Sequence, residues 1–256
     1  MKNALLIIIG SIFVASCGVS ERFINDDEIN GSNPVRKGGE FIFNMREGDC
    51  GAKDYGDGRG ESDCVNGNVQ QRVWTRKDYH APKTLEYGFD VFIDPNFTYQ
   101  ETLSYRPRGS IEIAEWNRKN VIKNHMYEMH LTGRGVTFED KTCFSSSRFG
   151  EWNAVVVRAK WSNNDDGELV VRCNEKVIYS KKGPNLIPPG CGTSVKSQCK
   201  LEFIDVSKPI VFKLGPKYFG FGRDWREMGR ASPFLSWPEN GINIKMRNLY
   251  EGRIRN

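Results

Sequence analysis

The chain has 256 residues, of which 38% are hydrophobic, 27% are charged and 12% are aromatic, and its formal net charge is +5. So many aromatic side chains can bury a core, which excludes an intrinsically disordered chain. The sequence has no block of lysine and arginine and, after its N-terminus, no apolar run near the ~20 residues of a membrane span. These absences exclude a nucleic-acid-binding tail and an internal membrane protein, while the mild positive charge suits an anionic ligand.

The N-terminus resembles a bacterial lipoprotein signal. Lys2 precedes an apolar run of signal length, and the run ends in Val14-Ala15-Ser16-Cys17-Gly18. Small residues directly before a cysteine resemble the lipobox, in which that cysteine is lipidated and becomes the new N-terminus. An ordinary signal peptide with an accidental cysteine is the alternative. Gly18 after the cysteine, with no aspartate there, resembles lipoproteins that are sent to the outer membrane rather than held at the inner one. We therefore expect an exported lipoprotein of the outer membrane or periplasm.

This N-terminal pattern sets the expected domain boundaries. We expect a signal peptide over residues 1–16 and a lipidated Cys17 followed by a flexible tether over residues 17–37. The tether is predicted because this stretch is rich in glycine, serine and asparagine. A single domain is then expected over residues 38–256.

The cysteine count supports an exported, disulfide-bonded protein. Assigning Cys17 to the lipid leaves six cysteines, which allow fifteen pairings, so the sequence alone does not fix the connectivity. Proximity along the chain favours Cys50–Cys64 and Cys191–Cys199, which leaves Cys143–Cys173 as the third pair. A zinc site is disfavoured because no Cys-x-x-Cys pair occurs.

Strand-like alternation dominates the rest of the chain. From Leu85 to Ile93 every second residue is apolar, which is typical of a strand with one buried face. A short helix is expected over residues 119–127. Further strands are expected over residues 40–46, 70–77, 109–117, 152–161, 168–173, 176–180, 200–205, 209–214 and 242–250. The pattern predicts an all-β, single-domain sandwich with few short helices.

Acidic residues suggest two further sites. Glu112 and Glu115 could form the carboxylate pair of a glycoside hydrolase, but a spacing of three predicts that they lie on opposite faces of a strand. Hydrolysis is therefore disfavoured. A second acidic group could gather a structural calcium ion, although a solvated loop is the simpler interpretation; it comprises Asp54, Asp57, Glu61 and Asp63. No other metal or cofactor is expected.

An ordered set of segments is similar to the heparin-lyase-I-like polysaccharide lyases. Glu86 to Ile93 resembles a long core strand of that family, Ile113-Ala114-Glu115-Trp116-Asn117 lies where the family has a strand with Gln-x-His, and Phe212-Lys213-Leu214-Gly215-Pro216-Lys217-Tyr218 resembles its late Phe-Lys-x-Gly-x-Tyr strand. The likeness covers roughly residues 38–250. It implies a concanavalin-A-like β-jelly roll and cleavage of a uronate glycoside by β-elimination.

That reaction needs three groups on one open face. A cation or amide neutralises the uronate carboxylate, a base removes the C5 proton, and an acid protonates the leaving oxygen. The family's Gln and His positions hold Glu115 and Asn117, which share strand parity. Asn117 could neutralise a uronate but cannot act as a base, and a charged Glu115 would repel the substrate carboxylate. Tyr218 is a further catalytic candidate, but it stands one residue beyond the family's tyrosine position, which is occupied by Lys217. This offset puts Tyr218 on the opposite face unless Gly215-Pro216 forms a bulge.

Other residues could complete the catalytic and binding set. His125 and His130 lie near the expected helix, and either could serve as the base, although a surface histidine is the simpler interpretation of each. Arg72 and Arg76 could grip an acidic sugar bidentately, or could form an exposed basic strand face. Lys213 shares these two interpretations, as does Lys217.

The sequence therefore predicts a monomeric lipoprotein that acts on an acidic polysaccharide. Its membrane contact would be the lipid anchor alone, and no nucleic-acid partner is expected. The first hypothesis is a polysaccharide lyase that acts by β-elimination. The alternative is a non-catalytic carbohydrate-binding envelope lipoprotein, favoured by the replaced Gln and His positions, and a structural envelope protein stays open as a third hypothesis.

Overall fold

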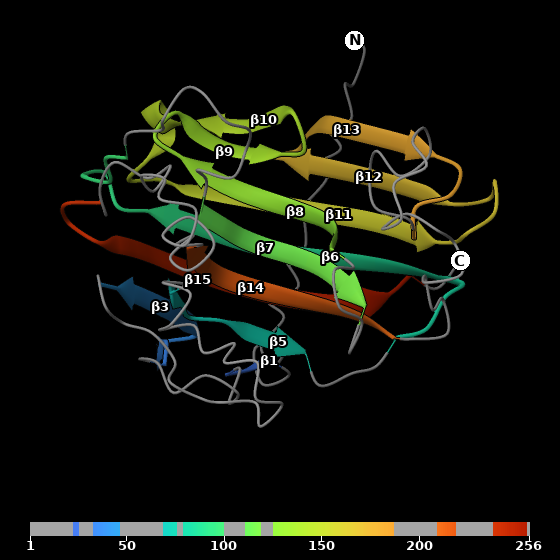
Figure 1. Cartoon of the computed structure of the whole chain (residues 1–256), viewed down its shortest axis with the longest axis horizontal. Coiled ribbons are helices and arrows are strands. Elements are labelled where there is room, and N and C mark those ends of the chain that lie inside the picture. Colours follow the sequence, from blue (N-terminus) through green and yellow to red (C-terminus); the bar gives the residue numbers. More distant parts are fainter. Residues whose placement is uncertain are drawn as a thin grey trace, which may run out of the picture.

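The structure is a computed structural model of the chain, and it describes part of the sequence. The described ranges are residues 23–25, 33–46, 69–75, 79–99, 111–118, 125–186, 209–218 and 238–254. Within them, the chain forms two antiparallel sheets that stack face to face as a sandwich (Figure 1). No helix in these ranges has the length and apolarity that crossing a membrane requires.

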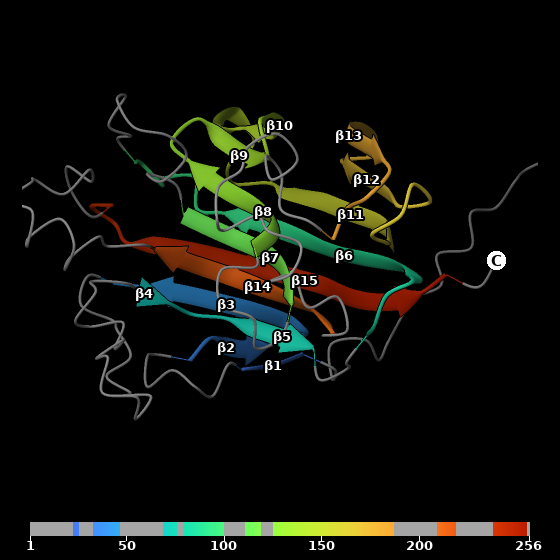
Figure 2. The ribbon, with the colours of Figure 1, turned by 45° about the vertical axis from the view of Figure 1, so that its right-hand side comes forward.

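The first sheet, sheet A, contains eight strands. Seven follow the order β1-β5-β14-β7-β8-β9-β10, and β4 also pairs with β14. Their bounds are β1 Phe23–Asn25, β4 Val69–Gln70, β5 Val73–Thr75, β7 Ile111–Arg118, β8 His125–Thr132, β9 Gly135–Phe138, β10 Lys141–Ser145 and β14 Ile210–Tyr218. Figure 2 shows β7, β8 and β14 running side by side in this layer.

The second sheet, sheet B, contains seven strands in the order β13-β12-β11-β6-β15-β3-β2. Their bounds are β2 Val35–Lys37, β3 Glu40–Met45, β6 Lys83–Ile93, β11 Trp152–Trp161, β12 Glu168–Cys173, β13 Lys176–Lys182 and β15 Ile242–Arg253. A single-turn 3-10 helix, η3 Ser146–Arg148, follows β10. The predicted all-β jelly-roll sandwich with few short helices is confirmed.

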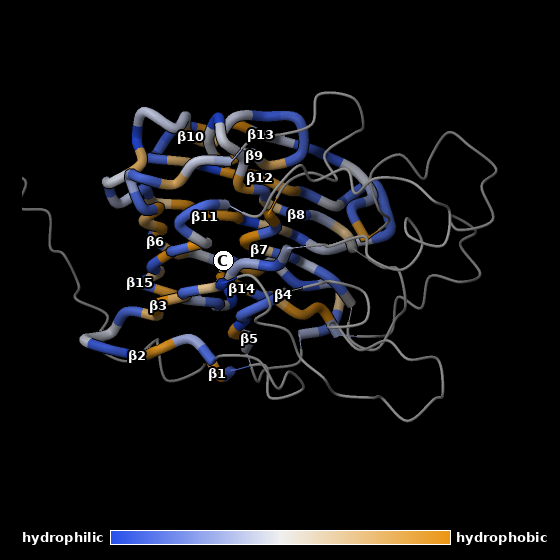
Figure 3. Tube along the Cα trace, turned by 60° about the vertical axis from the view of Figure 1, so that its left-hand side comes forward, coloured by the Kyte–Doolittle hydropathy of each residue, from blue (hydrophilic) through white to orange (hydrophobic). Residues whose placement is uncertain are grey.

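Alternation along the strands creates the core between the sheets. Hydrophobic and hydrophilic positions alternate in both layers, as Figure 3 shows, so each sheet buries one face. Trp116 of sheet A stacks on Phe212 with 5.0 Å between ring centroids, and Tyr87 of sheet B meets Phe212 edge-on at 4.9 Å. The Trp161 indole donates to the Tyr87 hydroxyl at 2.7 Å, so this polar pair is satisfied inside the core.

The expected helix over residues 119–127 is wrong where it can be checked. Residues 125–127 begin strand β8, and residues 119–124 lie outside the described ranges. Methionine, glutamate and histidine favour no strand, which hid this element. The decisive signal is the alternation of buried Tyr127, Met129 and Leu131 with more exposed neighbours. Strands β9 and β10 were not expected, and the expected strand over 200–205 lies outside the described ranges.

The sandwich begins earlier than residue 38. Strands β1 and β2 both lie within the expected tether over residues 17–37. Phe23 of β1 is 3% exposed and meets Phe212 edge-on at 6.1 Å, so it belongs to the core. The expected signal peptide and Cys17 lie outside the described ranges.

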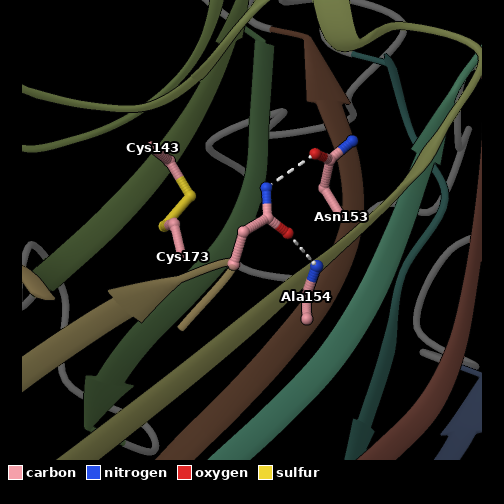
Figure 4. The surroundings of a disulfide bond; sticks show 5 residues. Cys143, Asn153, Ala154 and Cys173 are labelled. Carbon is pink, nitrogen blue, oxygen red and sulfur yellow. Dashed lines mark hydrogen bonds between the residues drawn. A yellow bond between two sulfur atoms is a disulfide. The ribbon is translucent and has the colours of Figure 1, made fainter. Parts of the chain in front are cut away.

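A disulfide joins the two sheets at one edge. Cys143 on β10 of sheet A bonds to Cys173 on β12 of sheet B, as expected (Figure 4). Beside it, the turn residue Asn174 accepts from the Ala154 amide at 2.9 Å and donates to Asn153 at 2.9 Å. Cys50, Cys64, Cys191 and Cys199 lie outside the described ranges, so their pairing stays a prediction.

Removing this disulfide is expected to lower the free energy of unfolding by about 3–4 kcal/mol. The bond closes a loop with a sequence separation of 30 and restricts the unfolded chain accordingly. Urea denaturation of the Cys143→Ser/Cys173→Ser variant, compared with the oxidised wild type, measures the loss. Unchanged far-ultraviolet circular dichroism would show that the sandwich still forms. Equal midpoints for the two proteins would contradict the prediction.

Candidate functional site

A bulge in β7 brings Glu112 and Glu115 to the same face of sheet A. The pairing of β7 with β8 shifts between Glu112 and Ala114, so β7 carries one extra residue there. One extra residue reverses the parity of all the positions beyond it. The sequence expectation that these two glutamates lie on opposite faces is therefore wrong. Both side chains are buried on the face turned away from sheet B, beside the same arginine.

Backbone pairing arranges this face in three cross-strand rows. Equivalent positions on neighbouring strands lie side by side on one face of a sheet. The first row contains Glu112 with His130 and Lys217, the second contains Glu115 with Glu128 and Lys213, and the third contains Asn117 with the backbone partners His125 and Val211. Strand β14 continues the first two rows to Gln70 and Trp74.

A second bulge, in β14, places the lysines. The pairing of β14 with β7 shifts between Leu214 and Lys217. Gly215 has a φ of 114°, and a Cβ there would lie 2.2 Å from the Gln71 carbonyl oxygen, so only glycine fits. The backbone N–H of Gln71 donates to the Pro216 carbonyl at 3.0 Å and fixes the bulge. Lys213 pairs with Glu115 and Lys217 pairs with Glu112, so the two lysines lie on the face of these glutamates, as their shared parity predicted.

Tyr218 consequently lies on the other face of β14. Its side chain is 8% exposed and belongs to the hydrophobic core between the sheets. The expectation that Tyr218 is catalytic is therefore wrong for this arrangement. The physical reason is the one-residue offset from Lys217, which the bulge does not reverse.

Arg72 forms the centre of a buried ion-pair cluster. Its side chain is 1% exposed, and its two terminal nitrogens contact Glu112 and Glu115 separately. Glu115 also accepts from the Asn117 amide at 2.8 Å. A guanidinium committed to two buried carboxylates does not grip a substrate, so Arg72 is a structural cation rather than the expected sugar ligand. Arg76 lies outside the described ranges.

Burial and neighbouring charges alter the acidity of this cluster. Burial raises the pKa of Glu112 to about 7; the Arg72 charge opposes this rise, whereas Glu115 adds to it. For Arg72, burial alone would lower the pKa, but the Glu112 and Glu115 carboxylates raise it above its ordinary value. Arg72 therefore stays charged, and Glu112 is the member of the cluster that titrates near neutral pH.

Three carboxylates of this face lie close enough to be considered as metal ligands. Oxygen atoms of Glu112, Glu115 and Glu128 all lie within 4.8 Å of one another. The Arg72 guanidinium already contacts two of them and places a positive charge beside them. We therefore assign no metal to this cluster. The acidic loop proposed for calcium, Asp54 to Asp63, lies outside the described ranges.

The two candidate bases occupy different rows. His130 lies on β8 rather than beside a helix, and its Nε2 is 3.1 Å from a Glu128 oxygen. His125 is the backbone partner of Asn117 at the start of β8. Glu128 was not anticipated, because the strand that carries it was not. The alternation of Tyr127, Met129 and Leu131 would have placed Glu128 and His130 together on the outer face.

Replacing Glu112 with glutamine is expected to remove a pH dependence of stability. The folded-state pKa of about 7 exceeds the ordinary value of 4.5, so the folded protein binds the extra proton between these values. The wild type therefore loses stability as the pH rises from 4.5 through 7, at most by about 1.4 kcal/mol per pH unit. The Glu112→Gln variant should lack this slope.

Urea unfolding midpoints between pH 5 and 8 measure the difference between the two proteins. Burial also raises the pKa of Glu139 to about 7, but Glu139 is present in both proteins and cancels in the comparison. Parallel stability curves for the wild type and the variant would contradict the prediction.

Comparison with solved structures identifies the fold. The protein superposes on the endo-β-1,4-glucuronan lyase of the fungus Trichoderma reesei with a TM-score of 0.54 and 12% identity, covering 93% of this chain and 92% of that chain. An alginate lyase gives 0.49 at 12% identity over 90% and 89% of the two chains, and an alginate lyase from a Chlorella virus gives 0.42 at 12% identity over 72% and 76%. Neither a family model nor a curated protein matches the chain.

The fold is thus the β-jelly roll that occurs in polysaccharide lyases. At these identities the likeness defines the fold and not the substrate. The narrower resemblance to heparin-lyase-I-like enzymes stays a prediction from the sequence.

Proposed function

We propose that the protein is a polysaccharide lyase that cleaves a uronate-containing acidic polysaccharide by β-elimination. The observation that carries the proposal is the half-buried Asn117 amide, which Glu115 holds on the outer face of sheet A. Lys213 and Lys217 add two ammonium groups to that face. The jelly-roll fold shared with a glucuronan lyase supports the same class of reaction.

The chemistry follows from the weak acidity of the uronate C5 proton. Asn117 would donate an amide hydrogen to the uronate carboxylate and stabilise the charge that develops there. A base then removes the C5 proton, and the electron pair forms a C4–C5 double bond. The bond from C4 to the glycosidic oxygen breaks, and that oxygen takes a proton. The products are a saturated end and an unsaturated uronate end.

The buried Arg72 reduces the repulsion between Glu115 and a substrate carboxylate. Glu115 beside a substrate carboxylate would repel it if its charge were uncompensated. Arg72 contacts the Glu115 carboxylate and offsets its charge, and Lys213 is the cross-strand partner of Glu115. A uronate can therefore approach Asn117 with less repulsion than the sequence alone suggests.

Backbone register favours His125 over His130 as the base. His125 is the direct partner of Asn117 across β7 and β8, and residues in one row are the nearest cross-strand neighbours. His130 lies in the row of Glu112, two rows away, and already contacts Glu128. This backbone pairing makes His125 the first residue to test as the base.

Release of unsaturated uronate ends tests the function. Purified protein is incubated with glucuronan, alginate and heparin, and ultraviolet absorbance of the new double bond is followed. We expect product from at least one polymer, and a larger loss of rate for His125→Gln than for His130→Gln. An absence of absorbance on all three polymers, with authentic lyases degrading the same batches, would overturn the proposal.

A non-catalytic glycan-binding protein is the second candidate. The observation that favours it is the charge balance of the outer face of sheet A. Three glutamates offset three cations there: Glu112, Glu115 and Glu128 against Arg72, Lys213 and Lys217. A site without excess positive charge could hold a polymer weakly without activating it. Retardation on gels cast with the three polymers, with no unsaturated product, would favour binding alone.

Export as an outer-membrane lipoprotein is a separate proposal that rests on the N-terminal sequence. Lipidation of Cys17 would anchor the domain to a membrane. Expression of the full chain and of its Cys17→Ser variant in a bacterial host tests this. We expect the wild type in the detergent-soluble membrane fraction and the variant in the periplasm; equal distributions would contradict lipidation.

A further inference from the structure

Three hydrogen-bonded side chains on the outer face of sheet A connect a buried position to a more exposed one. Arg72 is 1% exposed, Glu115 is 2% exposed, and Asn117 is half-buried. Arg72 donates to one oxygen of Glu115, and Asn117 donates to the other at 2.8 Å. A buried cation is thus connected to a surface amide through a single carboxylate.

The chemistry of the carboxylate fixes how the amide is oriented. An ionised carboxylate only accepts hydrogen bonds, so the Asn117 atom that faces Glu115 is Nδ2 and not Oδ1. The second hydrogen of Nδ2 then remains on the same nitrogen, which is polarised by a charge-assisted bond. Without a partner of this kind the amide could flip and present its oxygen to an anion.

Arg72 makes this arrangement rigid. Its guanidinium donates to Glu115, so a turn of the Glu115 carboxylate would break its contact with a buried cation. Arg72 donates to the Oε2 atom of Glu115, and Asn117 donates to its Oε1 atom. Both oxygens of Glu115 therefore act as acceptors at once.

We propose that Glu115 and Arg72 are positioning residues that orient the Asn117 amide toward the substrate carboxylate and do not themselves touch the sugar. This inference rests on the proposed lyase function. It changes the roles expected from the sequence, in which Glu115 was catalytic and Arg72 bound the substrate. It also explains how a glutamate can stand beside a uronate site.

Glu112 provides a matched control for Glu115. Both glutamates lie on β7, both are buried, and both contact Arg72. Among the described hydrogen bonds, Asn117 contacts Glu115 and not Glu112. Substituting either one by glutamine removes one buried carboxylate at nearly constant volume, but only Glu115→Gln changes the partner of the amide.

Kinetics of Glu115→Gln and Glu112→Gln on the polymer that the wild type cleaves form the first readout. Glu115 uses one oxygen for Arg72 and the other for Asn117, whereas a glutamine has a single oxygen and places an NH2 group at one of these two positions. We expect kcat to fall about 10–100-fold for Glu115→Gln with KM within ~3-fold, because the amide acts mainly in the transition state. For Glu112→Gln both constants should stay within ~3-fold. Equal losses for the two variants, or a change confined to KM, would overturn the proposal.

The nitrogen-15 NMR signals of the Asn117 side-chain amide form a second readout that needs no activity. They are assigned by their loss in Asn117→Asp. We expect them to shift in Glu115→Gln and to stay in place in Glu112→Gln. Arg72→Lys is a second variant with the same expectation as Glu115→Gln, because a lysine keeps the charge but lacks the fork.

The two readouts separate two kinds of failure. A wild type that cleaves no polymer overturns the lyase function. Asn117 signals that do not move in Glu115→Gln or in Arg72→Lys overturn the positioning role, whatever the activity.

Discussion

Replacing Asn117 with alanine is expected to lower the turnover of the proposed lyase about 100-fold, with little effect on folding. The amide is the hydrogen-bond donor that Glu115 holds on the outer face of sheet A. Removing one donor that stabilises a developing negative charge typically lowers kcat by about 10²–10³. The half-buried position predicts a small effect on stability. Initial rates of unsaturated product formation measure the loss.

An asparagine on the opposite surface supplies the control. Asn44 lies on β3 of sheet B with an exposed side chain, so Asn44→Ala should keep the wild-type rate. A further comparison uses Asn117→Asp, which keeps the size but puts a negative charge beside the uronate. We expect Asn117→Asp to be at least as slow as Asn117→Ala. Wild-type turnover in Asn117→Ala would remove this residue from the active site.

Replacing Arg72 with methionine is expected to lower the free energy of unfolding by about 3–5 kcal/mol. The substitution fills a similar volume but leaves Glu112 and Glu115 without the cation that both contact. Uncompensated charges in a buried site account for destabilisation of this size. Urea denaturation at neutral pH, followed by tryptophan fluorescence, gives the difference from the wild type.

A rescue experiment separates charge from packing. The triple variant Arg72→Met/Glu112→Gln/Glu115→Gln removes the cation and both carboxylates together. We expect it to recover most of the lost stability, because neutral groups of similar volume often replace a buried ion cluster without loss. A triple variant no more stable than Arg72→Met would show that the arginine stabilises the sheet through packing alone.

Much of the fold was predictable from local pattern. The alternation from Leu85 to Ile93 predicted the centre of β6, and the remaining pair Cys143–Cys173 was correctly assigned by elimination. Period-two alternation is a direct consequence of one buried face, so such strands are visible in a single sequence. Strand β8 was missed because its methionine, glutamate and histidine residues favour no strand and its alternation is short.

The candidate site was predictable only in part. Glu115 and Asn117 share a face, as their spacing of two predicts, and their contact confirms it. Glu112 was assigned to the other face because parity was counted through Ile113, where the bulge occurs. A bulge depends on pairing with the neighbouring strand, so one strand's own sequence does not reveal it. The role of Arg72 likewise depends on two glutamates about 40 residues away, at separations of 40 and 43.

Side-chain links connect sheet A to sheet B at two opposite edges of the sandwich. At one side the Cys143–Cys173 bond ties β10 to β12. At the other side, the side-chain amide of Gln71, between β4 and β5 of sheet A, accepts from the backbone N–H of Asn44 in sheet B and donates to its carbonyl, each at 2.9 Å. The Gln71 side chain thus bonds to β3 as a neighbouring strand would. The two sheets are therefore cross-linked at both sides of the sandwich. A polymer bound by the proposed lyase would therefore lie on the outer face of sheet A, over β7 and β14, rather than between the two sheets.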